Sequence, residues 1–210
     1  MNLEHIKKTY GDITILDDTS ITFSPGEAVG ILGVNGSGKS TLLNYIAEHY
    51  IKSEEVRCGY VPQENPLFPE LAAVDNIRMW TSLNKKQIIE ALHSEALLPL
   101  GITEFMDRPV KKLSGGMKKR LSIASVLIND PGLLLMDEPL AALDLPAKQD
   151  IVSYMRSYLS RGNIVIIASH EEEIFHFCNR VYLLKHGKLI DTAELSKQGI
   201  SYLSLLRDSL

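Results

Sequence analysis

This chain of 210 residues is poor in the features that mark secreted, membrane-spanning and nucleic-acid-binding proteins. Its two cysteines, Cys58 and Cys178, lie far apart and match no metal or redox spacing, so we expect them to be buried thiols of a reducing compartment. No hydrophobic run approaches the ~20 residues that a membrane-spanning helix needs. The N-terminal segment lacks the apolar core of a signal peptide. The net charge of −4, without a long basic run, does not favour binding to nucleic acid.

The hydrophobic pattern predicts an α/β fold with an inserted helical lobe. Continuous apolar segments, such as Leu133–Met136, are typical of strands that are covered on both faces. Between about residues 64 and 129 the chain instead favours helices, and Asn84 with Gln87 matches the capping box of a helix start. The C-terminal tail predicts a short helix. We therefore predict a single domain, with an α/β core from residues 1–63 and 130–210, a small antiparallel β region at its N-terminus, and a helical subdomain from residues 64–129.

A glycine-rich segment follows the predicted strand that ends at Leu32 and precedes a predicted helix. It matches GxxxxGK[ST], the pattern of loops that bind the phosphates of nucleotides. Glycines let backbone N–H groups turn inward around phosphate oxygens, and the following helix N-terminus favours negative charge. Lys39 is expected to reach the β- and γ-phosphates, and the Ser40 hydroxyl to ligate Mg²⁺. The predicted nucleotide contacts are Gly33, Asn35, Gly36, Ser37, Gly38, Lys39, Ser40 and Thr41. The loop alone leaves GTPases, nucleotide kinases and transport ATPases open.

Two acidic residues, Asp137 and Glu138, follow the predicted strand at Leu133–Met136. Ligands of an open α/β sheet bind outside the carboxyl ends of its strands, so both carboxylates are expected beside the phosphate loop. Asp137 is predicted to hold Mg²⁺ through a water molecule. Glu138 lies one residue further out and is predicted to polarise the water that attacks the γ-phosphate.

The segment Leu113-Ser114-Gly115-Gly116, placed between the phosphate loop and this acidic pair, resembles the signature motif of the ATP-binding cassette (ABC) family. The segment heads a predicted helix, so the Ser114 hydroxyl and the amides of Gly115 and Gly116 can donate hydrogen bonds to a phosphate. The resemblance covers nearly the whole chain and implies the fold of a P-loop NTPase with an inserted helical subdomain.

Four further residues occur in the order of this family's motifs. By resemblance, Tyr10 stacks on adenine, Gln63 senses Mg²⁺ and the attacking water, and Asp144 belongs to the loop that crosses between subunits. His170, at the end of a predicted strand, is similar to the residue that hydrogen-bonds the γ-phosphate. The resemblance thus implies a catalytic set of Glu138, His170 and Gln63, and a metal set of Ser40, Gln63 and Asp137.

The family resemblance also implies partners and a location. Two subunits lie head to tail, and the signature of one closes the ATP site of the other, so ATP and Mg²⁺ are the expected ligands of an ATP-dependent dimer. A separate transmembrane permease is the expected second partner, with the chain peripheral on the cytoplasmic face of the membrane. Nucleic acid is not an expected partner.

Three segments favour an export-type subunit. Met117 stands where importer-type subunits commonly have Gln, and the segments after Gln63 and after His170 are similar to export subunits. The short connection between Lys39 and Gln63 departs from the family, which implies that its small antiparallel β region is trimmed there. Ala141 replaces a common Ser or Thr of the crossing loop. An importer-type subunit, and a soluble ABC ATPase in cluster assembly or regulation, remain alternatives.

Overall fold

The computed structural model describes residues 1–51, 56–64, 66–193, 202 and 204. The strands are β1 (Asn2–Tyr10), β2 (Ile13–Thr22), β3 (Ala28–Leu32), β4 (Cys58–Val61), β5 (Leu133–Asp137), β6 (Ile164–Ser169), β7 (Arg180–Lys185) and β8 (Lys188–Asp191). The α-helices are α1 (Lys39–Ile51), α2 (Ala73–Arg78), α3 (Lys85–Leu92), α4 (Gly115–Leu127), α5 (Leu145–Ser160) and α6 (Glu172–Phe175). Three 3₁₀ helices are η1 (Leu98–Leu100), η2 (Ile102–Glu104) and η3 (Val110–Lys112).

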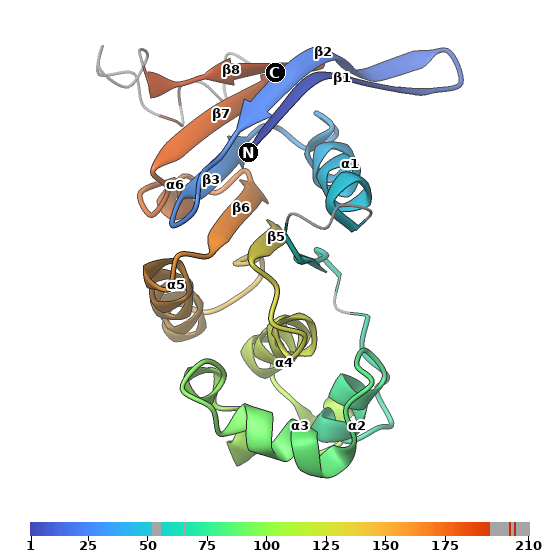
Figure 1. The fold of residues 1–210 in the computed structure, drawn as a ribbon, viewed down its shortest axis with the longest axis vertical. Helices are drawn as coiled ribbons and strands as arrows, with labels where there is room; N and C mark the ends of the chain where they lie inside the picture. Colours follow the sequence, from blue (N-terminus) through green and yellow to red (C-terminus); the bar gives the residue numbers. More distant parts are fainter. Residues whose placement is uncertain (52–55, 65, 194–201, 203, 205–210) are drawn as a thin grey trace.

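A six-stranded sheet of order β4-β5-β6-β3-β7-β8 forms the centre of the molecule. All neighbouring pairs are parallel except β7 and β8, which form an antiparallel hairpin. A separate antiparallel pair, β1 and β2, lies across the top of the molecule in Figure 1. These features confirm the predicted α/β core and the small antiparallel region at the N-terminus.

The central strands are apolar throughout because both faces of the sheet are covered. On β5, Leu133 and Leu135 belong to the hydrophobic cluster that includes α1, β1 and β2. Leu134 and Met136 point to the opposite cluster, which includes α4, α5 and the helical lobe. Alternate residues of one strand therefore serve two cores, and the continuous apolar run in the sequence has this physical origin.

The helical lobe lies at the lower end of the molecule in Figure 1 and holds α2 and α3, with α4 between the lobe and the sheet. The predicted capping box is confirmed, because the Asn84 side chain accepts from the Gln87 amide (3.0 Å) and Gln87 Oε1 accepts from the Asn84 amide (2.9 Å). The prediction of helices up to residue 129 was wrong for part of the lobe, which contains 3₁₀ helices and turns. Residues 98–112 contain three short 3₁₀ helices separated by non-helical residues. Pro99 lacks an N–H donor, and Gly101 adopts a left-handed backbone (φ 63°) that ends the first of them.

A buried asparagine fixes the segment that leads from the sheet into the lobe. Asn76 is fully buried on α2, and its Oδ1 accepts from the Phe68 amide at 2.7 Å. Its Nδ2 donates to the carbonyls of Phe68 (3.1 Å), Leu71 (3.3 Å) and Ala72 (3.1 Å). These hydrogen bonds hold the backbone of residues 68–72 against the first turn of α2.

Other expectations concern the ends and the connections. Cys58 and Cys178 are free and half-buried rather than fully buried, and burial raises the pKa of each thiol to about 12. Between Lys39 and Gln63 the described residues form only α1 and β4. The predicted C-terminal helix lies largely outside the described residues. Within the described residues, no helix has the length and hydropathy to cross a bilayer.

Candidate nucleotide-binding site

The carboxyl ends of β3, β4, β5 and β6 meet at one edge of the sheet, and a cleft of about 450 Å³ opens outside them. The strand order brings the acidic pair after β5 next to the loop after β3, although about a hundred residues separate them in the sequence. The cleft unites residues from three predicted motifs with one residue of β2. Its lining is Ile15, Asn35, Gly36, Gly38, Lys39, Ser40, Thr41, Gln63, Asp137 and Glu138.

The phosphate loop connects β3 to α1 and depends on its glycines. Gly36 (φ 80°) and Gly38 (φ 102°) have left-handed backbone conformations that L side chains rarely adopt. A Cβ atom on Gly38 would also lie 2.7 Å from Ile15 Cγ2 of β2. Lys39 is 6% exposed, and its Nζ donates to the carbonyls of Gly33 (2.8 Å) and Val34 (3.2 Å). The ammonium group thus lies over the loop, where a bound phosphate group would contact it.

Glu138 is held by contacts from two other parts of the chain, the end of β6 and Lys39. Its carboxylate is 5% exposed and accepts from Ser169 Oγ (2.8 Å), pairs with His170 Nδ1 (2.9 Å) and lies 3.6 Å from Lys39 Nζ. The Glu138 amide donates to the Ala168 carbonyl at 2.9 Å. Its backbone is left-handed (φ 44°), which costs a non-glycine residue about 1–3 kcal/mol. Such strain concentrates at functional sites, and here it accompanies the turn of the chain at the end of β5.

Asp137 lies beside Glu138 at the inner end of the cleft and is 3% exposed. The Tyr60 hydroxyl donates to Asp137 Oδ2 at 3.4 Å, and burial, followed by the charge of Asp137, raises the pKa of Tyr60 to about 12. Ser40, Gln63 and Asp137 all line the cleft and carry oxygen donors, the ligand type that Mg²⁺ requires. The described residues contain no group of three or more His, Cys, Asp or Glu residues placed to hold a metal ion. One hydroxyl, one amide and one carboxylate oxygen fit Mg²⁺ that shares its coordination with phosphate and water, which is the usual arrangement for this ion.

Several predicted site residues lie outside this cleft. Ser114 is the N-cap of α4 and accepts from the Met117 amide at 3.2 Å, and Gly115 faces open space. A Cβ atom on Gly116 would lie 2.8 Å from Ala147 Cβ, so the starts of α4 and α5 are adjacent. The Asp144 side chain caps α5 by accepting from the Ala147 amide at 3.0 Å.

Tyr10 also does not line the cleft. Its ring is 56% exposed at the end of β1, and Lys8 Nζ lies 5.8 Å from the ring centroid. Gly33 contributes its carbonyl to Lys39, and Ser37 lies on the outer side of the loop, where its Oγ is buried without a hydrogen-bond partner.

The motif search missed two buried residues that contact this site. Ser169 is 2% exposed and donates to Glu138, and its place at the end of a predicted strand beside His170 was the available signal. Lys119 is 3% exposed, and its Nζ donates to the carbonyls of Pro62 (3.1 Å) and Gln63 (3.4 Å). Burial lowers the pKa of Lys119 to about 8, against the opposing charges of Asp137 and Glu138.

A parallel sheet with a lysine-bearing phosphate loop after one strand and a buried Asp-Glu pair after a neighbouring strand defines a P-loop nucleoside triphosphatase. The model of the family "ABC transporter" matches residues 16–141. The chain belongs to the ABC transporter family and is an ATP-binding, ATP-hydrolysing cassette of that family.

Curated relatives cover most of the chain. It is 33% identical to the linearmycin resistance ATP-binding protein LnrL of Bacillus subtilis, over 90% of this chain and 68% of that protein. It is 34% identical to the Nod factor export ATP-binding protein I of Rhizobium etli, over 90% of this chain and 66% of that protein. It is 35% identical to the spermidine/putrescine import ATP-binding protein PotA of Bacteroides thetaiotaomicron, over 90% of this chain and 45% of that protein.

The fold is also found in solved cassettes. The dimeric structure of MJ0796, a bacterial ABC transporter cassette, superposes with a TM-score of 0.75 at 26% identity, covering 90% of this chain and 95% of that one. This likeness confirms the predicted fold class. The assignment of individual site residues remains a prediction from the motifs and the geometry above.

The arrangement around Glu138 predicts the effect of a single substitution. Glu138→Gln keeps the size of the side chain and an oxygen that can accept from Ser169, but it removes the base. We expect kcat for ATP hydrolysis to fall about 10²–10⁴-fold, the usual contribution of a general base, while nucleotide affinity is retained. Phosphate release and nucleotide titration measure the two quantities.

Glu171→Gln is the matched control, because Glu171 lies nearby but pairs with Lys148 (2.6 Å) outside the cleft. It is expected to hydrolyse ATP as the unmodified chain does. Hydrolysis by Glu138→Gln at the rate of this control would refute the assignment of the base.

Proposed function

We propose that this chain is the ATP-hydrolysing subunit of an exporter, and that it works as a head-to-tail dimer with two ATP molecules between the copies. A separate membrane subunit supplies the path for the transported substrate. The single observation that carries this proposal is the position of the signature residues. Ser114, Gly115 and Gly116 form an open helix start on α4, outside the cleft of their own chain.

The start of α4 has the properties of a phosphate-binding surface. The helix is 13 residues long and carries no acidic residue in its first turn, so its N-terminus presents a partial positive charge. Ser114 uses one lone pair for the Met117 amide and keeps its O–H as a donor. These donors have no nucleotide to bind within one chain. A second copy turned head to tail would place them across the γ-phosphate from Lys39.

The residues of the cleft support a defined hydrolytic step. Lys39 exchanges its carbonyl partners for the β- and γ-phosphates, and Glu138 accepts a proton from the water that attacks the γ-phosphorus, which separates ADP from phosphate. His170 hydrogen-bonds the γ-phosphate, and Gln63 orients the attacking water. Ser40, Asp137 and Gln63 would hold Mg²⁺, which would supply positive charge against the negative charge of the phosphates.

Two exposed residues complete the proposed site. Tyr10 offers its ring to the adenine base, because an exposed aromatic face gains from stacking. Asp144, at the start of α5 and next to Gly116, belongs to the surface that meets the second copy. Closure of the dimer around ATP, and its release after hydrolysis, would then be a shift between two populated states that nucleotide binding controls.

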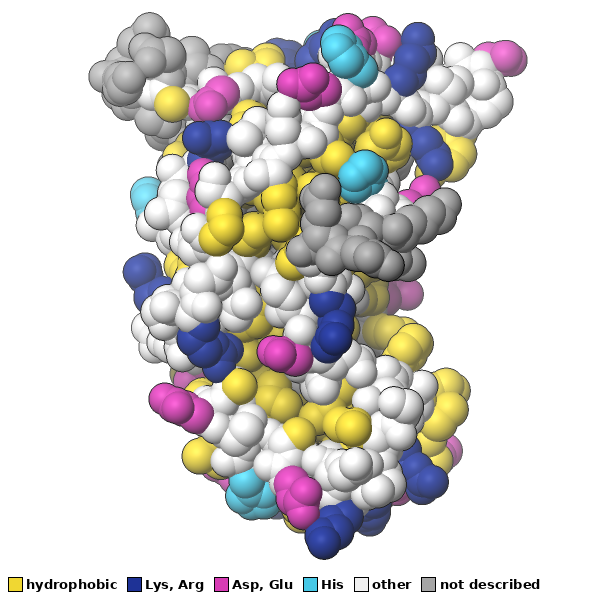
Figure 2. Space-filling view, viewed as in Figure 1, with side chains coloured by type: hydrophobic (Ala, Val, Ile, Leu, Met, Phe, Trp, Pro, Cys, Tyr) yellow, Lys and Arg dark blue, Asp and Glu magenta, His cyan; other side chains and the backbone are white. Residues whose placement is uncertain are grey.

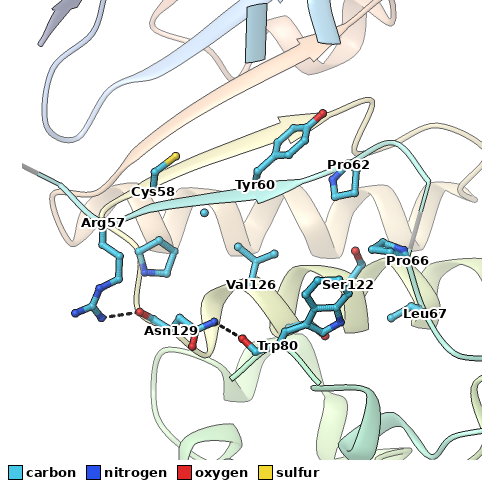
Figure 3. A pocket seen from close by; sticks show the side chains of 13 residues that line it. Arg57, Cys58, Tyr60, Pro62, Pro66, Leu67, Trp80, Ser122, Val126 and Asn129 are labelled. Carbon is cyan, nitrogen blue, oxygen red and sulfur yellow. Dashed lines mark hydrogen bonds between the residues drawn. The ribbon is translucent and has the colours of Figure 1, made fainter. Parts of the chain in front are cut away.

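A groove between the sheet and the helical lobe supports docking of the membrane subunit. It has a volume of about 350 Å³ and, in Figure 3, lies between β4 and the side chains of Leu67, Trp80 and Val126. Arg57 donates to the Asn129 carbonyl (2.7 Å), and Asn129 donates to the Trp80 carbonyl (3.0 Å), closing one end.

Hydrophobic side chains also gather at the edge of the lobe in Figure 2. Phe68 and Trp80 are 47% and 48% exposed, and Leu67 is half-buried against the core. An apolar groove with an exposed aromatic rim fits a short amphipathic helix in a cytoplasmic loop of a membrane protein. We propose that this contact places the chain on the cytoplasmic face of the membrane.

Export is favoured over import by the residues after the signature and by the names of relatives. Met117 follows the signature where importer-type subunits commonly have Gln, and one relative is named for Nod factor export. The importer alternative rests on the similarity to a spermidine/putrescine import protein. A soluble ABC ATPase would use the same cleft but would leave the groove without a membrane partner.

The dimer proposal predicts opposite effects of two isosteric substitutions at the signature. Ser114→Asp and Ser114→Asn both provide good N-caps for α4. Only the aspartate places a negative charge where the γ-phosphate of the second copy's ATP would lie. We expect Ser114→Asp to bind ATP but to remain monomeric with ATP in sedimentation velocity, whereas Ser114→Asn dimerises. Equal ATP-dependent dimerisation of the two variants would reject a signature that acts between copies.

The docking proposal predicts the effect of a charge in the groove. Trp80→Glu should weaken binding to the membrane subunit by about 2 kcal/mol or more, roughly 30-fold in affinity, because an aromatic side chain that lines the groove is replaced by a charge. Leu98→Glu is the control, since Leu98 is 49% exposed on the same lobe but does not line the groove. Binding to a membrane subunit in detergent and basal ATPase activity are the measurements. Equal weakening by both variants would argue against the groove.

A further inference from the structure

Lys119 is a buried cation that the proposed hydrolytic step does not use. It lies on α4, and its side chain is 3% exposed. Removing an ammonium group from water costs several kcal/mol unless hydrogen bonds and nearby charges compensate. A methionine or leucine would fill this position without that cost, so the charge and its contacts call for an explanation.

The contacts of Lys119 are to backbone carbonyls and not to side chains. Its Nζ donates to the carbonyls of Pro62 (3.1 Å) and Gln63 (3.4 Å), the residues that leave β4 and enter the lobe. Charge-assisted hydrogen bonds of this kind are stronger than neutral ones. They fix the backbone at Gln63, while the Gln63 residue itself lines the nucleotide cleft. Lys119 therefore helps to fix the backbone position from which the Gln63 side chain extends into the cleft.

The other end of the same helix segment is the signature. Ser114 caps α4 five residues before Lys119, a rise of about 7.5 Å along a regular helix. Hydrogen-bonded helical turns move as a rigid unit over so short a span. A displacement of Ser114 is therefore carried directly to the Lys119 ammonium and to the carbonyls that it holds.

We infer that Lys119 is a positioning residue that couples the two ATP sites of the dimer, by tying the signature helix, which serves one site, to the Gln63 loop, which serves the other. This inference rests on the head-to-tail dimer proposed above. When the signature of one chain binds the ATP held by the second copy, α4 moves with the signature. Lys119 then moves the backbone of Gln63 in its own chain, so that the Gln63 side chain takes its position at the ATP of that chain. Each site thus receives a correctly placed Gln63 only when the opposite site is occupied, which makes hydrolysis cooperative in ATP.

The variants separate this role from simple packing. Lys119→Met keeps the apolar stem and removes the donors, whereas Lys119→Arg keeps charged donors. Lys118→Met is the matched control, because it makes the same change at the adjacent, half-buried position of α4. Rates of ATP hydrolysis are measured over a range of ATP concentrations on the full chain, with ATP affinity and thermal unfolding measured in parallel.

We expect Lys119→Met to lower kcat about 10- to 100-fold, the loss typical of a misplaced active-site group, and to lower the Hill coefficient towards unity. ATP affinity of the monomer should not change. Lys119→Arg should retain most of kcat and the cooperativity, and Lys118→Met should behave as the unmodified chain. If Lys119→Met does not fold, Lys119→Gln, a shorter neutral donor, replaces it in the same comparison.

Three results would overturn the inference. An unchanged Hill coefficient and kcat in Lys119→Met would show that the contact is structural only. An equal loss of kcat in Lys119→Arg and Lys119→Met, accompanied by an equal loss of thermal stability, would also show that Lys119 has only a structural role. If the unmodified chain hydrolyses ATP without cooperativity and forms no ATP-dependent dimer, the dimer proposal itself is wrong. This outcome is distinguishable from the other two because it is measured on the unmodified chain, without any Lys119 variant.

Discussion

The contact between Lys39 and Glu138 is the interaction on which the site depends. Both side chains are almost fully buried, and Lys39 Nζ lies 3.6 Å from Glu138 Oε1. A buried charge without a partner costs several kcal/mol, so each group offsets the desolvation of the other. The pair also joins the loop after β3 to the end of β5. A bound triphosphate would attract Lys39 and repel Glu138. The contact between Lys39 and Glu138 would then be replaced by a contact between Lys39 and phosphate.

The sheet order makes this contact possible. β6 lies between β3 and β5 and pairs with both, so its end brings Ser169 and His170 to the Glu138 carboxylate. The left-handed backbone of Glu138 is maintained by the hydrogen bond from its amide to the Ala168 carbonyl and by the contacts of its carboxylate with Ser169 and His170. The Glu138 carboxylate is therefore positioned by backbone pairing and buried hydrogen bonds.

The sequence predicted most of the fold, and it predicted that the phosphate loop and the acidic pair meet at one edge of the sheet, for identifiable physical reasons. Apolar runs and the phosphate-loop pattern specify β3, β5 and β6 and the residues at their carboxyl ends, because those patterns have local causes. The 3₁₀ helices near Pro99 were missed because the helical pattern of the lobe was extended through Pro99 and Gly101, although both residues disfavour a regular α-helix. Lys119 was missed because it cannot be distinguished from Lys118 in a basic helix segment. Only the packing of α4 against the Gln63 loop makes one of them buried.

The central claim is that one ATP lies between the phosphate loop of one copy and the signature of another. The most direct test is the structure of the Glu138→Gln variant with ATP and Mg²⁺. The account predicts a dimer in which each γ-phosphate has Lys39 of one copy on one side and Ser114 of the second copy on the other. A structure in which ATP is bound and the start of α4 faces solvent in every copy would contradict it.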